Sequence, residues 1–181
     1  NMSVISVSDP ALGTEAIKAS LKFDHPCYFR AGNGQYLVLY NPEEIRFEFG
    51  KGIVARDGKD LTIFTHGAMV ADAVMLADKL RKDGISIKVI DMFTIKPIDK
   101  ELVIAATKET KKVVVWEDHY IYGGLGSTIA DLYADEGAYP DKFLRIGIPE
   151  TYPGFGTREA LYKRYGMDAE SVGAKINDML K

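Results

Sequence analysis

The sequence is short of the residues and runs that mark several classes of protein. Of its 181 residues only Cys27 is a cysteine, which excludes an internal disulfide and favours a reducing compartment. Lys and Arg number 23 against 26 Asp and Glu, so no basic excess indicates a nucleic-acid surface. No apolar run approaches the roughly 18 residues of a membrane span, and the N-terminus lacks the apolar stretch of a signal peptide. We therefore expect a soluble, cytoplasmic protein with neither nucleic acid nor membrane as a partner.

What the sequence does contain is an alternation of β-rich runs and amphipathic helices. With 46% hydrophobic and 27% charged residues, its composition is that of an ordinary globular protein of one domain, or one domain plus a fragment of a neighbour. The apolar runs predict strands at residues 59–65, 85–93, 112–116 and 143–148. Helical periodicity fills the stretches between them, and Asp99, Thr157 and Asp168 are suited to cap helices.

Strands separated by helices predict βαβ units and a mostly parallel sheet. For residues 46–181 we expect an α/β domain of three layers, with a mixed sheet of about five strands flanked by helices. Residues 51–55 are the candidate antiparallel edge strand, because only the short 56–60 turn joins them to the next strand and parallel pairing needs a longer crossover.

Residues 1–45 have a different organisation. Residues 3–7 and 26–30 are predicted strands, and between them Asp9-Pro10 is an N-cap followed by proline at the first position of a helix over 11–21. Residues 36–49 are the predicted linker. Because two strands and one helix cannot cover both faces of a sheet, this segment either adds to the following sheet or ends a domain whose beginning is missing.

Glu117-Asp118-His119 follows the third predicted strand of the α/β domain, at the carboxyl end where open α/β sheets place their sites. Two carboxylates and an imidazole could transfer protons or hold a metal. The alternative is a polar loop after a buried strand, since adjacent residues point in different directions and no second His or Cys cluster completes a metal set.

Gly123-Gly124-Leu125-Gly126-Ser127 leads into the next predicted helix, which Gly126 or Ser127 opens. Its backbone N–H groups could bind a phosphate at the helix N-terminus. The run is neither GxGxxG nor a Walker loop, however, and glycines that allow the helix to start close to the sheet explain it equally well.

Three further residues carry reactive or charged groups. His66-Gly67 marks the turn after the 59–65 strand, and a lone His there is more often a turn residue than a catalyst. Arg30 ends a strand close to Gly32, Asn33 and Gly34, and its guanidinium could bind a phosphate or carboxylate, or form an interdomain salt bridge. Cys27 is expected to be a small buried hydrophobe.

In their order along the chain, these segments resemble the C-terminal part of transketolase-type thiamine-diphosphate enzymes. The tail Leu161-Tyr162-Lys163-Arg164-Tyr165-Gly166-Met167-Asp168 continues the resemblance, which covers nearly the whole chain. The matching segments are Asn1-Met2, Ser8-Asp9-Pro10, Pro26-Cys27-Tyr28-Phe29-Arg30, Phe49-Gly50-Lys51-Gly52, 60–67, 90–99, Glu117-Asp118-His119, Gly123-Gly124-Leu125-Gly126-Ser127 and Arg145-Ile146-Gly147-Ile148-Pro149.

The resemblance implies that residues 1–45 are the remnant of a pyrimidine-binding domain with its linker, and that 46–181 are the C-terminal domain. It favours the second interpretation of the N-terminal segment, a domain whose beginning is missing. The family's Gly-Asp-Gly metal and diphosphate motif and its activating glutamate are absent from these residues. We therefore expect thiamine diphosphate and magnesium in the complete enzyme only, and an isolated chain that binds neither and is inactive.

For the complete enzyme, the resemblance implies transfer of a two-carbon ketol unit between sugar phosphates, with the cofactor as electron sink. Arg30 occupies the place of an arginine that binds the sugar phosphate in this family, and no catalytic, cofactor or metal residue is assigned. The C-terminal domain serves mainly in domain packing and subunit assembly. The expected partner is therefore the missing diphosphate- and pyrimidine-binding part or a partner subunit, in a homodimer or heterotetramer.

Three alternatives stay open. Within the same superfamily the chain could be a fragment of a deoxyxylulose-phosphate synthase or of the decarboxylating component of 2-oxo acid dehydrogenase complexes. It could also be a non-catalytic assembly or regulatory domain that uses the fold alone.

Overall fold

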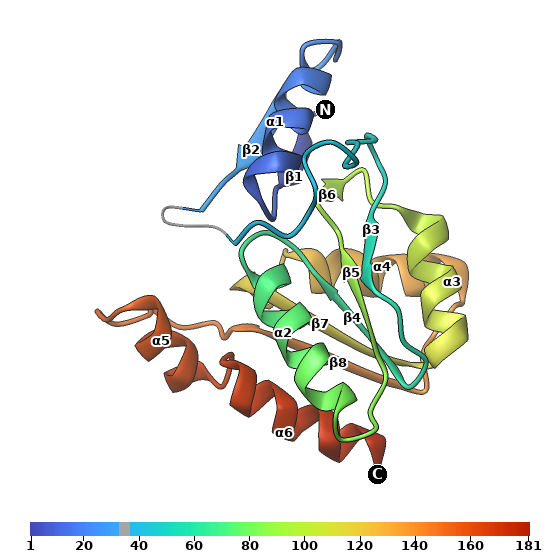
Figure 1. Cartoon of the computed structure of the whole chain (residues 1–181), viewed down its shortest axis with the longest axis vertical. Coiled ribbons are helices and arrows are strands. Elements are labelled where there is room, and N and C mark those ends of the chain that lie inside the picture. The colour runs from blue at the N-terminus through green and yellow to red at the C-terminus, as the bar shows by residue number, and fades with distance from the viewer. Residues whose placement is uncertain (33–36) are drawn as a thin grey trace.

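The computed structural model describes residues 1–32 and 37–181, which form two sheets surrounded by helices (Figure 1). The elements in chain order are β1 (Ser3–Ser6), α1 (Pro10–Ser20), β2 (Cys27–Arg30), β3 (Ile53–Arg56), β4 (Leu61–Thr65), α2 (Met69–Arg81), β5 (Ile87–Asp91), β6 (Thr94–Lys96), α3 (Lys100–Thr110), β7 (Lys112–Tyr120), α4 (Leu125–Glu136), β8 (Lys142–Ile148), α5 (Arg158–Tyr165) and α6 (Ala169–Leu180).

The larger sheet has five strands in the order β3-β5-β4-β7-β8. β4 pairs in parallel with β5 and β7, and β8 pairs in parallel with β7, so the predicted parallel sheet is confirmed. β3 is the antiparallel edge strand, as expected, but its partner is β5 rather than the next strand along the chain. The reason is that β4 is central and already has β5 on one side and β7 on the other.

Helices cover both faces of this sheet. One apolar cluster joins it to α2 and α6 and contains Trp116, and the other joins it to α3 and α4 and contains Phe64. The predicted caps of these helices are confirmed: Asp99 accepts a hydrogen bond from the Leu102 N–H at 3.1 Å, and Asp168 accepts one from the Ser171 N–H at 3.1 Å. The five strands with α2, α3, α4 and α6 are called the main block below.

The N-terminal segment builds a second sheet with the order β2-β1-β6, called the small sheet below. It does not extend the five-stranded sheet, so the first of the two alternatives for this segment is wrong. β6 was not predicted as a separate strand, because its three residues have no apolar pattern and depend on antiparallel pairing with β1. The helix cap is confirmed, since Asp9 accepts a hydrogen bond from the Leu12 N–H at 2.7 Å.

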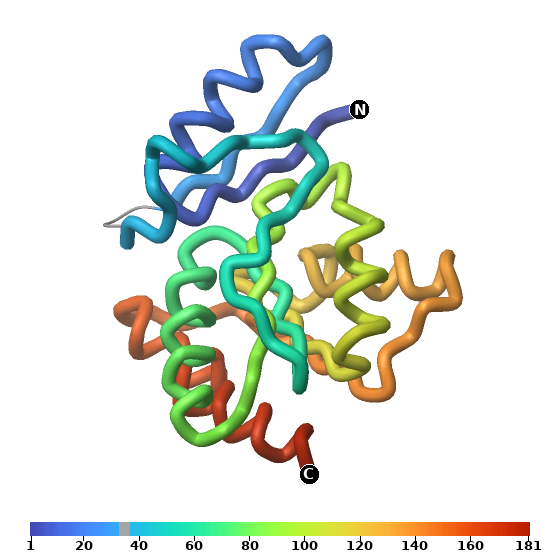
Figure 2. Tube along the Cα trace, turned by 45° about the vertical axis from the view of Figure 1, so that its right-hand side comes forward, coloured from blue at the N-terminus to red at the C-terminus, as the bar shows by residue number. Residues whose placement is uncertain are grey.

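Packing of the small sheet against α1 creates one small apolar cluster of Ile5, Val7 and Ala16. Cys27 packs against this cluster as a small hydrophobe, but it is half-buried and not fully buried as expected, and desolvation raises the pKa of its thiol. Residues 37–49 form neither helix nor strand, and Figure 2 shows this segment crossing between the N-terminal part and the main block before β3. Tyr36, the first residue of the predicted linker, lies outside the described residues.

Two boundaries differ from the prediction near the motifs of interest. β7 runs to Tyr120, so Glu117, Asp118 and His119 lie within the strand and not in a loop after it. Pairing with β8 continues there past an irregularity and includes Tyr120 opposite Ile148. α4 begins at Leu125, slightly earlier than the sequence predicted, because no side chain at its N-cap Gly124 marks the start.

Candidate functional site

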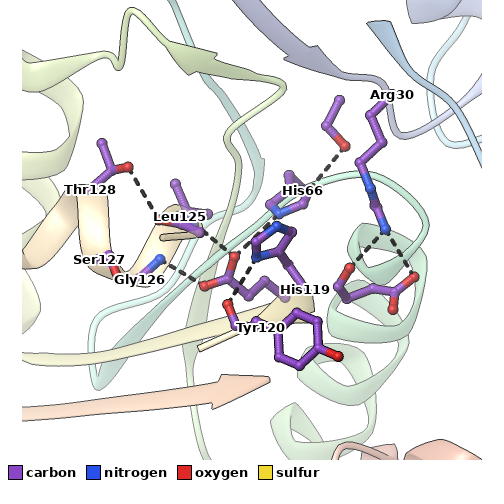
Figure 3. A network of polar contacts seen from close by, with 12 residues as sticks. Arg30, His66, His119, Tyr120, Leu125, Gly126, Ser127 and Thr128 are labelled. Carbon is purple, nitrogen blue, oxygen red and sulfur yellow. Dashed lines mark hydrogen bonds and ion pairs between the residues drawn. The ribbon is translucent and has the colours of Figure 1, made fainter. Parts of the chain in front are cut away.

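The carboxyl ends of four strands meet where the small sheet contacts the main block. Ser6 and Arg30 end β1 and β2, and His66 directly follows β4. Glu117 and His119 lie in the last part of β7 (Figure 3). Open α/β sheets bind their ligands at this end of the strands. The topology therefore brings together residues that are far apart in the sequence, such as Ser6 and His119.

Glu117 caps α4 from the neighbouring strand. Its carboxylate oxygens accept hydrogen bonds from the Leu125 and Gly126 N–H groups, each at 2.8 Å, and the side chain is 1% exposed. A helix N-terminus stabilises a negative charge in this position. A Cβ at residue 124 would overlap the Glu117 carboxylate, and one at residue 126 would lie 2.9 Å from Arg145 Cδ. The glycines thus allow the helix to start close to the sheet, which is the second of the two interpretations of this run.

The same hydrogen bonds limit what the glycine run can offer a phosphate. The Leu125 and Gly126 N–H groups are taken by Glu117, and the Gly123 N–H group donates to Ser127 Oγ at 2.9 Å. At the N-terminus of α4 the Glu117 carboxylate therefore occupies the place that a phosphate would take on these two N–H groups.

His66 connects the two sheets. Its Nδ1 lies 2.9 Å from Ser6 Oγ on β1, and its Nε2 lies 3.7 Å from Glu117 Oε2 on β7. The ring is 4% exposed. Gly67 has a φ of +59°, and a Cβ there would lie 2.9 Å from Ser6 Oγ, so the turn requires glycine. His66 is therefore both the turn residue that the sequence indicated and a buried contact between the two parts of the molecule.

Arg30 reaches from β2 to the main block. Its Nη2 donates to the Asp118 main-chain carbonyl at 2.8 Å and lies 3.4 Å from Asp118 Oδ2. Both side chains are about one third exposed, so the pair is open to solvent. A contact across two sheets is what the salt-bridge alternative predicted. Asn33 and Gly34, which the sequence placed close to Arg30, lie outside the described residues.

A cavity of about 530 Å³ opens beside these groups. Its volume falls in the range of small-molecule sites, about 300–1,000 Å³. The cavity is lined by Val4, Ser6, Tyr28, Arg30, His66, Ile95, Lys96, Ile98, His119, Gly123, Gly124 and Thr128. Ser6 and Lys96 had no signal in the sequence, because a single serine or lysine on a strand becomes part of a site only through the contacts between the sheets.

A magnesium ion does not fit this cavity. Mg²⁺ prefers carboxylate oxygens and water as ligands. Among the described residues that line the cavity none is an aspartate or glutamate, and no three His, Cys, Asp or Glu side chains in residues 1–32 and 37–181 gather as a metal set. No reaction step through a metal-bound cofactor is derived from these residues.

A second polar cluster lies nearby and was not predicted. Asp91, at the end of β5, is fully buried and accepts hydrogen bonds from Ser8 Oγ at 2.5 Å and from the Tyr40 hydroxyl at 2.9 Å. Burial raises the pKa of Asp91 to about 7. Ser8 and Tyr40 belong to the N-terminal segment and Asp91 to the main block, so this cluster also joins the two parts.

Comparison with known proteins identifies the family of this chain. The family described as "Transketolase, C-terminal domain" matches residues 50–172. The chain belongs to this family. A "Putative transketolase C-terminal section" of Methanocaldococcus jannaschii is 38% identical over 100% of this chain and 56% of its own length.

Two further similarities extend over nearly the whole chain. A "1-deoxy-D-xylulose-5-phosphate synthase" of Syntrophotalea carbinolica is 35% identical over 99% of this chain and 28% of its own length. A solved structure titled "Split gene transketolase, inactive beta4 tetramer" superposes with a TM-score of 0.92 at 36% identity, covering 99% of this chain and 58% of that one. The chain thus spans about half, or less, of the length of these relatives. In the described part of the chain no helix is long and apolar enough to cross a membrane.

Proposed function

We propose that this chain is one part of a transketolase-type enzyme that transfers a two-carbon ketol unit between sugar phosphates. Residues 1–45 are the end of the pyrimidine-binding domain with its linker, and residues 46–181 are the C-terminal domain. Support comes from the family match, from relatives of about twice this length, and from a split-gene transketolase among the similar structures. Thiamine diphosphate and magnesium are held by the remaining part of the enzyme, where the cofactor stabilises the carbanion.

The observation that carries the proposed substrate class is the position of Arg30. Its guanidinium lines a cavity of sugar-phosphate size, and both of its contacts to Asp118 come from Nη2, one nitrogen of a group with five N–H donors. Arginine binds phosphate through charge-assisted hydrogen bonds. Arg30 thereby combines the two roles that the sequence left open, a contact between the two sheets and a phosphate ligand.

Removing Arg30 tests this role. Hydrogen bonds to charged groups contribute about 1.5–3 kcal/mol each, and 1.4 kcal/mol is a factor of ten in affinity. In the assembled enzyme, Arg30→Ala is expected to raise KM for phosphorylated substrates about tenfold or more, with a smaller effect on kcat because the phosphate is remote from the reacting bond. Unphosphorylated substrates serve as the control and should be nearly unaffected. Equal losses for both substrate types, with a lower Tm, would assign Arg30 to the salt bridge alone.

The division of labour between this chain and the rest of the enzyme is tested by calorimetry. The chain alone is expected to show no saturable binding of thiamine diphosphate with magnesium, because the cavity offers no carboxylate to the metal. Addition of the diphosphate-binding part should restore cofactor binding and two-carbon transfer. Saturable binding by the chain alone would contradict the proposal.

A synthase activity is the second candidate, and the relative from Syntrophotalea carbinolica favours it. Product analysis of the assembled enzyme separates the two: formation of 1-deoxy-D-xylulose 5-phosphate supports the synthase, and exchange between a ketose and an aldose phosphate supports transketolase. An assembly role for this chain fits its exposed aromatic side chains Tyr152 and Phe155, which are 98% and 109% exposed. A chain that assembles but leaves the activity of its partner unchanged would be the non-catalytic domain.

A further inference from the structure

The cavity at the contact of the two sheets gathers nitrogen-bearing side chains from both of them. Arg30 comes from β2 and Lys96 from β6, both in the small sheet, and His119 comes from β7 of the five-stranded sheet. His66 lies at the same cavity and is buried, with its Nδ1 beside Ser6 Oγ, whereas His119 is exposed. Both imidazole rings are labelled in Figure 3. None of the described lining residues is acidic. A cavity that concentrates one sign of charge attracts the opposite sign.

The nearest carboxylates are already engaged. Glu117 accepts two backbone hydrogen bonds from α4 and faces His66, and Asp118 faces Arg30. His119 Nδ1 lies 2.9 Å from the Tyr120 carbonyl oxygen, which orients the ring. Lys96 is exposed on a strand whose register places it opposite Val4 of the small sheet. Lys96, from β6 of the small sheet, and His119, from β7 of the main block, therefore line a cavity that has no carboxylate among its described lining residues.

We infer that the cavity is a two-sided anion site, in which Lys96 and His119 bind the same phosphorylated ligand as Arg30. Arg30 contributes from the N-terminal strands, and the C-terminal domain contributes Lys96 and His119. Ser6 and Thr128 hydroxyls and the apolar side chains of Ile95 and Ile98 line the remaining wall. Such a wall suits a small polyol rather than a second charged group. The C-terminal domain is then part of the substrate site and not only a scaffold.

The ligand is assigned as a sugar phosphate, and this assignment rests on the proposed function. The same chemistry could recognise the diphosphate of a cofactor. The lack of acidic residues in the cavity argues against that source, because a magnesium-bound diphosphate brings a cation into the site. Both sources are therefore compared in the experiment.

Binding to the full 181-residue chain is measured by calorimetry with ribose 5-phosphate as the probe, and with ribose, inorganic phosphate and thiamine diphosphate plus magnesium as comparisons. Ribose 5-phosphate should bind saturably and ribose should not. Inorganic phosphate should compete with ribose 5-phosphate, and thiamine diphosphate with magnesium should not. Absence of saturable ribose 5-phosphate binding would overturn the inference, and displacement by thiamine diphosphate would overturn the assigned ligand.

Variants then separate the two sides of the site. Lys96→Ala and His119→Ala should each weaken ribose 5-phosphate binding about tenfold, as expected for the loss of one charge-assisted hydrogen bond. Lys96→Arg should retain most of the affinity because it keeps the charge. Lys79→Ala, at an exposed lysine on α2 outside the cavity, is the matched control and should bind like the wild type. Circular dichroism of each variant shows that a loss of binding is not a loss of fold.

The outcomes for the two proposals are distinct. If Arg30→Ala loses binding while Lys96→Ala and His119→Ala bind like the wild type, the two-sided site is wrong and the proposed role of Arg30 stands. If Lys96→Ala and His119→Ala lose binding while Arg30→Ala does not, the role of Arg30 is wrong and the contribution of the C-terminal domain stands.

Discussion

In the main block apolar side chains cover both faces of the sheet, whereas the small sheet has one small apolar cluster and contacts the main block through several polar contacts besides apolar ones such as Ile95. The polar contacts are Ser6–His66, Ser8–Asp91, Tyr40–Asp91 and Arg30–Asp118, and together they are called the seam below. Apolar burial is non-directional, while hydrogen bonds and ion pairs fix geometry. The stable part of the molecule is therefore the block, and the polar groups that could act on a ligand lie at the seam.

The difference also explains why the site needs both parts. The cavity has Arg30 on one wall and His66 and His119 on the other, so neither sheet alone contains it. A buried polar contact costs little only while both partners are present, because a partner left alone keeps its desolvation penalty. Separation of the two parts would therefore remove Ser8 and Tyr40 from Asp91, and Ser6 from His66 Nδ1.

The largest effect is expected from the core of the block. Trp116 is fully buried, and its Nε1–H donates to the Met167 carbonyl at 3.0 Å. Trp116→Ala should lower the free energy of unfolding by about 3–5 kcal/mol through cavity formation, with a further loss because the carbonyl loses its donor. Urea unfolding followed by circular dichroism measures this. Tyr152→Ala, at an aromatic residue that is 98% exposed, is the control and should stay within about 0.5 kcal/mol of the wild type.

The next effect is a pH dependence that originates at the seam. Because the folded pKa of Asp91 is about 7 and its ordinary value is 3.8, the folded state keeps a proton that the unfolded chain has lost. The free energy of unfolding should therefore fall by up to about 4 kcal/mol as the pH rises from about 4 to about 7, at 1.36 kcal/mol per unit of difference in pKa. Above about pH 7 it should stay level. Asp91→Asn keeps an acceptor for Ser8 and Tyr40 and removes the charge.

The Asp91→Asn variant should accordingly raise Tm more at pH 8 than at pH 5, and thermal unfolding across this range measures it. Asp178→Asn, at an exposed carboxylate on α6, serves as the control and should leave the pH profile in place. A profile for Asp91→Asn that follows the wild type between pH 4 and pH 7 would show that Asp91 is not the titrating group.

Much of the block could be predicted from the sequence, for a physical reason. β4, β5 and β7 contain buried apolar residues, β8 contains an apolar run that is mostly half-buried, and Asp99 and Asp168 cap helices with their own side chains. Such signals depend only on residues that are close in the sequence, so they can be recognised without knowledge of the tertiary structure. The partner of β3 could not be predicted, because it depends on which strand of the sheet still has a free edge.

The seam was predictable in part only. Arg30 was identified from its chemistry at a strand end and from the family resemblance, but its contact to Asp118 joins residues 88 positions apart. The polar end of β7 was interpreted as a loop because Glu117 breaks the apolar run, whereas α4 supplies the hydrogen bonds that allow the carboxylate to be buried. Lys96 had no local signal, because only the pairing of β6 with β1 brings it to the cavity.

The smallest effect is expected at the exposed edge of the seam, in the pair of Arg30 and Asp118. The two side chains approach only to 3.4 Å and are about one third exposed, and such pairs contribute about 0.2–1 kcal/mol. The shorter contact, 2.8 Å, is to the Asp118 main-chain carbonyl and is retained in Asp118→Ala. A double-mutant cycle of Arg30→Ala and Asp118→Ala should therefore give a coupling in the free energy of unfolding below about 1 kcal/mol.

This cycle also determines what Arg30 is for. If the coupling is small and Asp118→Ala leaves KM for phosphorylated substrates within about twofold of the wild type, the main-chain carbonyl is sufficient to hold the guanidinium at the cavity. The effect of Arg30→Ala on KM then comes from the lost contact to the phosphate of the substrate and not from the lost ion pair with Asp118. A coupling of several kcal/mol would instead make the salt bridge the main role of Arg30, and the phosphate site would have to rest on Lys96 and His119, the two residues that the segment 46–181 contributes.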